Sequence, residues 1–296
     1  MKKNLLVIIG PTAVGKSDLA ILLAKKYNGE IISADSRQVY RGLDLGTGKV
    51  IRDESRKDEF LSEGVAHHMI DIVDVDTQYN ISDFQKQTNK KIKEIWNKNK
   101  LPILCGGSPL YVISVLEGWI FPKTKPNVDL RNNLESKTTE ELFVMLKNLD
   151  PLRAKTIDAK NKRRVIRALE IVMQDSEVKP LTKKPINANV VILGIKKDRE
   201  EIRELIWKRL ERRIKEGMLA EIENLKKNGV TSKRLYDLGL EYRYVDMYLE
   251  GKLTLTEMKE QLYTKICQFA KRQMTWFKKF ENVLWLDNIK DVDLKF

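Results

Sequence analysis

The chain has 296 residues, which is long enough for one large domain or two with a substantial core. Its hydrophobic content of 42% is ordinary for a globular protein. Because no run of about 18 apolar residues occurs, we expect no membrane span and no membrane partner. The net charge of +13 favours a polyanionic partner such as nucleic acid, although a merely lysine-rich surface explains it equally well.

The two cysteines and two histidines carry no pattern of a metal site. Cys105 and Cys267 stand far apart, which predicts packing roles in a reducing cytosol and therefore a cytoplasmic protein. His67 and His68 are adjacent and lack the spacing of zinc ligands, so we interpret them as a structural pair.

A phosphate-binding motif lies near the N-terminus, between an apolar run at Asn4–Ile9 and a helical pattern at Leu19–Ala24. It matches G-x-x-x-x-G-K-[ST], the P-loop, and consists of Gly10, Pro11, Thr12, Ala13, Val14, Gly15, Lys16 and Ser17. Its glycines let the backbone wrap an anion, and the helix N-terminus that follows favours negative charge. Lys16 adds a positive charge and the Ser17 hydroxyl can reach a Mg²⁺ ion. The motif predicts a polyphosphate site without saying whether phosphate is transferred, hydrolysed or simply leaves.

Strands and helices then alternate as far as residue 116, which predicts a parallel α/β sheet. A second strand, Glu30–Asp35, ends in an acid where ligands of parallel sheets bind, so we expect Asp35 and Ser36 to face the P-loop. A turn-capping role for Asp35 is the alternative. The remaining expected segments are a glycine-rich loop at 41–49, a helix or mobile loop at 52–64, a strand at 68–73, a helix at 81–98, a strand at 101–105 and a helix at 110–116.

The pattern changes after Pro122. Residues 128–173 show helical patterns and no convincing strand, and residues 174–189 resemble a polar linker. We therefore predict an α/β core formed by residues 1–122 and 190–296, with an all-helical insertion domain at 123–189. The second part of the core is expected to contain a strand at 190–195, long helices at 198–227 and 256–280, and a strand at 283–286.

Several short motifs, each occurring once, are spread along nearly the whole chain. They are the P-loop, Ser33–Tyr40, Gly46–Lys49, His67–Ile72, Gly106–Tyr111, Asp150-Pro151, Arg164 with Arg167–Glu170, and Lys271–Phe277. Each is weak alone, but the ordered set resembles the tRNA dimethylallyltransferases (tRNA isopentenyltransferases). The resemblance implies a P-loop NTPase-like core with an inserted helical domain. The chain departs from the family pattern at Ser108, usually Thr, at Asp158-Ala159, usually His-Pro, and in Gly239–Arg243, which leaves the tRNA contacts near 158–162 and 234–243 open.

The resemblance also implies a reaction. A dimethylallyl group would move from dimethylallyl diphosphate to N6 of the adenosine that follows the anticodon of a tRNA, and the P-loop with Mg²⁺ would hold the leaving diphosphate. Asp35 is implied as the general base and Ser108 as a hydroxyl near the leaving group. The family's diphosphate-clamping arginine precedes a helix-ending glycine by eight residues, which gives Arg209 before Gly217, with Arg213 as the alternative.

The implied tRNA contacts lie in both predicted domains. The target base must be unstacked before it can react. The remaining contacts should be largely electrostatic. The alternative for the arginines of the insert is that they are solvated surface charges and bind no tRNA. By resemblance we expect a monomer with Mg²⁺ bound through Ser17. The expected tRNA-binding residues are Asp35, Ser36, Arg37, Gln38, Ser108, Arg131, Arg163, Arg164, Val165, Ile166 and Arg167.

Other functions share some of these features. A nucleoside or small-molecule kinase has the same P-loop and sheet but transfers the γ-phosphate of ATP and needs no tRNA. A P-loop RNA-binding protein without enzymatic activity would bind tRNA and release no diphosphate. An adenylate prenyltransferase acts on free AMP, and the arginine-bearing insertion and the charge of +13 argue against it.

Overall fold

The computed structural model describes residues 2–54, 58–122, 124, 126–175, 178, 182–287, 292 and 294. It divides into two compact units, Met1–Gly118 with Pro185–Phe296, which we call the core unit, and Trp119–Lys184, which we call the insert. The predicted boundaries were 122/123 and 189/190, and residue 123 itself lies outside the described residues.

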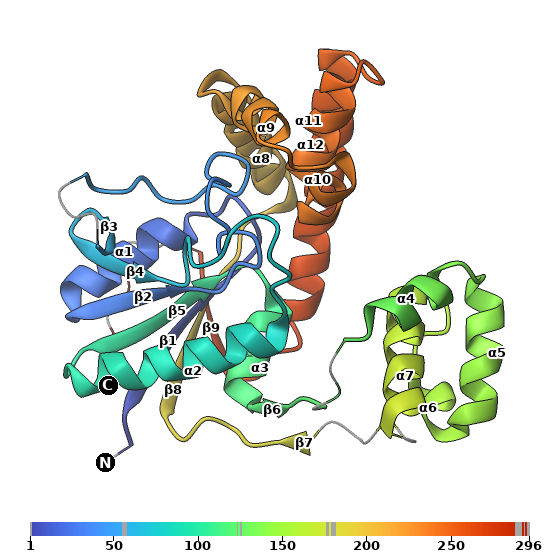
Figure 1. Ribbon diagram of the computed structural model, residues 1–296. Helices are drawn as coiled ribbons and strands as arrows, with labels where there is room; N and C mark the ends of the chain where they lie inside the picture. The colour runs from blue at the N-terminus through green and yellow to red at the C-terminus, as the bar shows by residue number, and fades with distance from the viewer. Residues whose placement is uncertain are drawn as a thin grey trace. The chain divides into compact units, whose positions relative to one another are not determined.

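A mostly parallel sheet runs through the core unit (Figure 1). Within the described residues its strand order is β3-β4-β2-β5-β1-β8-β9, and only the edge strand β3 is antiparallel to its neighbour. The predicted parallel α/β core is confirmed. The strands are β1 (Asn4–Ile9), β2 (Gly29–Ser33), β3 (Phe60–Ser62), β4 (Val65–His68), β5 (Leu101–Gly106), β8 (Asn189–Ile195) and β9 (Val283–Leu286).

Helices cover both faces of this sheet because its central strands are apolar on both sides. Leu6 and Ile8 of β1 point into a cluster with α1 (Lys16–Lys26), whereas Leu5, Val7 and Ile9 point into a cluster on the opposite face. That opposite cluster contains side chains from α2 (Ile81–Asn97) and α3 (Pro109–Glu117). Each fully buried aliphatic side chain contributes about 1.5–3 kcal/mol, so these clusters fix the position of the strand ends.

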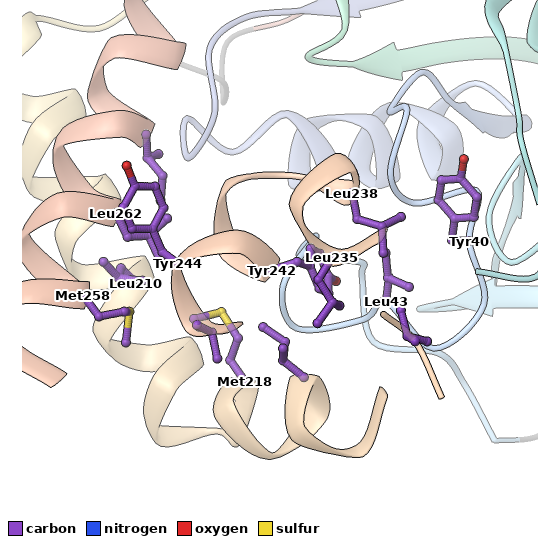
Figure 2. Close-up of a cluster of buried hydrophobic side chains, with 14 of the residues drawn as sticks. Tyr40, Leu43, Leu210, Met218, Leu235, Leu238, Tyr242, Tyr244, Met258 and Leu262 are labelled. Carbon is purple, nitrogen blue, oxygen red and sulfur yellow. The ribbon is translucent and has the colours of Figure 1, made fainter. Parts of the chain in front are cut away.

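Five further helices of the core unit share a third cluster with residues of the loop that follows β2. They are α8 (Arg199–Lys215), α9 (Met218–Lys227), α10 (Ser232–Leu238), α11 (Leu240–Leu249) and α12 (Leu255–Phe277). Figure 2 shows part of this cluster, including Leu235 and Leu238 of α10 and Leu43 of the loop. A single helix over 198–227 was predicted, but Gly217 at φ 108° ends α8 and begins α9.

Two other predictions in the core unit are wrong. The expected strand at 68–73 ends at His68, because Met69 (φ 63°) and Asp71 (φ 54°) adopt left-handed conformations that no strand accommodates. Residues 60–62, expected within a helix or mobile loop, instead form the edge strand β3.

The insert is mostly helical, as its apolar stripes predict, but the prediction of an all-helical domain misses a two-residue strand at Thr182–Lys183, in the expected linker. It contains α4 (Val128–Glu135), α5 (Thr139–Leu149), α6 (Pro151–Thr156), α7 (Lys162–Asp175) and the paired two-residue strands β6 (Trp119–Ile120) and β7 (Thr182–Lys183). Leu134, Leu142, Leu146 and Leu169 form the centre of its core. Among all described helices of both units, none is both long enough and apolar enough to span a bilayer.

Candidate active site

The P-loop lies between β1 and α1 and leaves the first turn of the helix open. Gly15 precedes α1 at φ 83° and offers no side-chain cap. The first N–H groups of α1 therefore have no capping oxygen and can bind an anion. Gly10 stands at φ 152°, and a Cβ there would lie 2.8 Å from the carbonyl oxygen of Ile195, so only glycine fits at this approach.

Lys16 lies folded back over this loop. Its Nζ donates to the carbonyl oxygen of Pro11 at 2.6 Å. Burial lowers the pKa of Lys16 to about 8, and Arg209 acts in the same direction, whereas Cys105 and Asp35 oppose the shift. A polyphosphate on the loop would raise this pKa again, since an adjacent negative charge stabilises the ammonium group.

Two arginines of α8 contact the P-loop and the glycine-rich loop after β2. Arg209 donates through Nη2 to Oγ1 of Thr12, which places its guanidinium on the P-loop, and burial lowers its pKa to about 9, with Arg213 as the next cause. Arg213 is only 6% exposed and donates to the carbonyl oxygen of Gly46 at 3.4 Å. Glu241 lies 3.8 Å from Arg213, but within the described chain Arg209 forms no ion pair. The site thus holds desolvated cations with little compensating negative charge, as expected of an anion-binding site.

Asp35 and Ser108 lie just beyond neighbouring strands, β2 and β5. Oδ1 of Asp35 accepts from the N–H of Arg37 at 2.8 Å, so Asp35 does cap the turn after β2. Its other oxygen, Oδ2, has no hydrogen-bond donor among the described residues and is free to act as a base. Oγ of Ser108 accepts from the N–H of Ser36 at 3.3 Å, which joins the two strand ends.

Gln273 of α12 holds the two loops of this site together, and sequence reasoning gave it no role. Its Oε1 accepts from the N–H of Thr12 at 2.9 Å, and its Nε2 donates to the carbonyl oxygen of Gly107 at 2.6 Å. The side chain is 4% exposed. In the sequence, its place within the Lys271–Phe277 motif of an amphipathic helix is the one feature that could have indicated a role for Gln273.

The glycine-rich loop after β2 is fixed by a carboxylate. Glu221 of α9 accepts from three consecutive backbone N–H groups, those of Asp44, Leu45 and Gly46, at 3.1, 2.6 and 3.1 Å. It also accepts from the hydroxyl of Tyr242 at 3.1 Å. Because Gly46 holds Arg213, Glu221 positions that arginine indirectly. This long-range contact had no signal in the sequence.

Gln38 ties the same loop to the end of β2. Its Oε1 accepts from the hydroxyl of Ser33 at 2.8 Å, and its Nε2 donates to the carbonyl oxygen of Gly48 at 3.2 Å. Gln38 thus has a structural task besides the tRNA contact that was predicted for it.

In the insert, the structure separates the predicted tRNA-binding residues into two groups. Val165 and Ile166 are buried in the core of the insert, so their side chains pack between helices, and the tRNA contact expected of them stays a prediction. Arg131 and Arg167 both bind the carboxylate of Glu170, which is 0% exposed. The helical periodicity of residues 163–167 alone indicates that Val165 and Ile166 face the core of the insert. The resemblance to the family assigns all five residues to tRNA binding without regard to that periodicity.

Arg163 and Arg164 are exposed on α7. With Arg153 and Arg167 they line a groove of about 340 Å³ within the insert, whose apolar lining comes from Ile157, Ala168, Ile171 and Val178. Arginines around a groove are suited to phosphate groups of a nucleic acid, since the guanidinium binds phosphate oxygens bidentately.

The residues near the P-loop fit a magnesium ion that is held mainly by the phosphates of a bound substrate and by water. Ser17 and Asp35 offer hydroxyl and carboxylate oxygens, the donors that Mg²⁺ prefers. In the described part of the chain, no three acidic, histidine or cysteine side chains cluster into an all-protein metal site. Mg²⁺ commonly keeps several waters and binds substrate phosphates through one or two protein ligands, so the donor set is compatible with it.

Comparisons with known proteins identify the relatives of this chain. Residues 38–280 match the IPP transferase family. The chain is 40% identical over 293 residues to tRNA dimethylallyltransferase 1 of Syntrophus aciditrophicus, covering 97% of this chain and 94% of that protein. It is 43% identical over 288 residues to tRNA dimethylallyltransferase 2 of Treponema denticola, covering 95% and 93%.

Solved structures give the same relationship. The full-length tRNA isopentenylpyrophosphate transferase of Bacillus halodurans matches with a TM-score of 0.71 and 36% identity, covering 99% of this chain and 92% of that one. A eukaryotic dimethylallyltransferase acting on tRNA matches with a TM-score of 0.78 and 27% identity, covering 98% and 74%. The chain therefore belongs to the IPP transferase family.

Proposed function

We propose that the protein is a tRNA dimethylallyltransferase, which transfers the dimethylallyl group of dimethylallyl diphosphate to N6 of the adenosine 3′-adjacent to the anticodon and releases diphosphate. The observation that carries the proposal is the juxtaposition of an anion cradle with a free carboxylate oxygen. Lys16 and Arg209 converge on the P-loop, and Asp35 lies close enough to both to affect their pKa values. Family membership supports the same conclusion.

The geometry assigns complementary tasks to the two sides of the site. As the bond between C1 and the diphosphate oxygen breaks, negative charge grows on the leaving group, and the P-loop N–H groups, Lys16 and Arg209 stabilise it. As N6 of adenine bonds to C1, it must lose a proton, and Oδ2 of Asp35 is the acceptor. Ser108, beside Asp35, supplies a hydroxyl near the leaving group. A bound Mg²⁺ ion, for which Ser17 is the proposed ligand, would supply further positive charge to the diphosphate.

The polyanionic partner is tRNA, and its proposed contacts lie in both units. In the core unit they are Asp35, Ser36, Arg37, Gln38 and Ser108, which surround the end of β2. In the insert they are Arg163 and Arg164, the exposed arginines of the groove on α7. We further propose that the enzyme acts as a monomer in the cytoplasm. Its substrate class and its two unpaired cysteines support this location.

The direct test is incubation with dimethylallyl diphosphate, Mg²⁺ and unmodified tRNA, followed by mass analysis of the nucleosides. We expect an adenosine that is heavier by one dimethylallyl group, with stoichiometric diphosphate. Parallel reactions with free AMP and with γ-labelled ATP distinguish an adenylate prenyltransferase and a kinase. Modified AMP without modified tRNA, or transfer of the γ-phosphate, would contradict the proposal.

A further inference from the structure

An exposed aromatic ring lies at the junction of α10 and α11, and no step of the proposed reaction uses it. Leu235 and Leu238 turn into the core of this helical region, whereas Tyr236, one position along, is 51% exposed. The guanidinium carbon of Arg243 lies 3.5 Å from the centroid of the Tyr236 ring. Its Nη2 also donates to the carbonyl oxygen of Tyr236 at 3.0 Å, so the ring is backed by a fixed cation.

The helix that carries this ring is fastened near the end of β2. Arg234, on the same short helix, donates to the carbonyl oxygens of Val75 and Thr77 at 2.7 and 2.9 Å, which fastens α10 to the loop after β4. Gly239, between the two helices, faces the side chain of Arg37, since a Cβ at Gly239 would lie 3.8 Å from Nε of Arg37. Arg37 follows Asp35 by two residues. Tyr236 therefore belongs to a helix that is fastened beside the end of β2, three residues before the glycine that faces Arg37.

This combination matches the chemistry of an unpaired nucleobase. Single-stranded RNA is bound through bases stacked on aromatic rings and guanidinium planes, and nearby cations neutralise the backbone. We propose that Tyr236, backed by Arg243, is a stacking platform for a nucleobase of the anticodon loop next to the adenosine that is modified. The Arg243 guanidinium holds the ring in place, so less entropy is lost when a base stacks on it. The proposal rests on tRNA being the substrate.

The test compares three variants at one position. Tyr236→Ala removes the ring, Tyr236→Leu keeps apolar bulk without a π face, and Tyr236→Phe keeps the π face. We expect KM for tRNA to rise about tenfold in the Ala and Leu variants and less than about twofold in the Phe variant. The kcat at saturating tRNA should stay within about twofold of wild type. Phe269→Ala, a change at a 38% exposed ring of α12, is the matched control and should leave KM unchanged.

A binding measurement that needs no turnover completes the test. An anticodon stem-loop carrying 2-aminopurine at one loop position at a time should show fluorescence quenching at a single position with wild-type protein, lost in Tyr236→Leu and kept in Tyr236→Phe. Unchanged KM and unchanged quenching in Tyr236→Leu would overturn the proposal and make the Tyr236–Arg243 contact only a link between two helices. Absence of tRNA modification by the wild-type enzyme would instead contradict the proposed function.

Discussion

The core unit and the insert both concentrate arginine and lysine, but they use these residues in opposite ways. Beside the P-loop, Lys16, Arg209 and Arg213 are desolvated, and burial lowers all three pKa values. In the insert, Arg131 and Arg167 converge on Glu170. Burial alone would raise the pKa of Glu170, yet hydrogen bonds from these arginines and from the N–H of Asn127 keep it below its usual value.

The difference shows which cations are available to a ligand. Cations held partly out of water with few paired acids destabilise the empty protein and are stabilised when an anion binds, a pattern typical of functional sites. Arginines that share a buried carboxylate are partly neutralised by it and mainly stabilise their own unit. The number of arginines in the insert therefore overstates how many positive side chains a tRNA can meet there.

Among these basic residues and their partners, the largest effect should come from removing a cation at the P-loop. We expect Lys16→Ala to lower kcat/KM for dimethylallyl diphosphate by about 10³-fold, because it deletes a donor to the leaving group. The affinity for tRNA should stay within about twofold, measured by filter binding. Lys25→Ala is the matched control on the same helix, since Lys25 pairs with Glu63 at the surface. An equal loss of tRNA affinity would mean that Lys16 meets the RNA.

A smaller effect, on stability rather than chemistry, is expected from Glu170→Ala. It would leave Arg131 and Arg167 without their shared carboxylate, at a cost of roughly 2–4 kcal/mol, below the full buried-pair penalty because both arginines remain partly exposed. Calorimetry and limited proteolysis of the insert would measure the loss. Glu135→Ala, which breaks the more exposed pair with Lys162, should cost less than about 1 kcal/mol. Similar stability of the two variants would show that the Glu170 pair is not important for the insert.

The smallest effect concerns the two exposed arginines of α7. Arg163→Ala combined with Arg164→Ala should weaken tRNA binding about tenfold and reduce the slope of log K against log salt by roughly two, because two fewer phosphates are neutralised. The melting temperature should hardly change, in contrast to Glu170→Ala. An unchanged salt slope would show that neither side chain meets phosphate.

The same contrast explains what could be predicted from the sequence. The P-loop, its flanking strand and helix, and the position of Asp35 follow from local patterns, since a motif and its periodicity need no distant partner. Gln273 and Glu221 could not be assigned, because each acts on a loop more than a hundred residues away in the chain. Arg131 and Arg167 resembled nucleic-acid contacts because their charge is visible in the sequence, whereas the burial of the carboxylate that they share, Glu170, is not.

The central claim is that Asp35 takes the proton from N6. Asp35→Asn keeps an oxygen that accepts from the N–H of Arg37, so the turn after β2 should survive. We predict that the single-turnover rate falls by about 10²–10⁴-fold while both substrates still bind, and that the loss is the same at low and high Mg²⁺ concentration. A rate close to wild type would show that Asp35 only caps the turn, and recovery at high Mg²⁺ would show that it orders the metal; either result would contradict its role as the base.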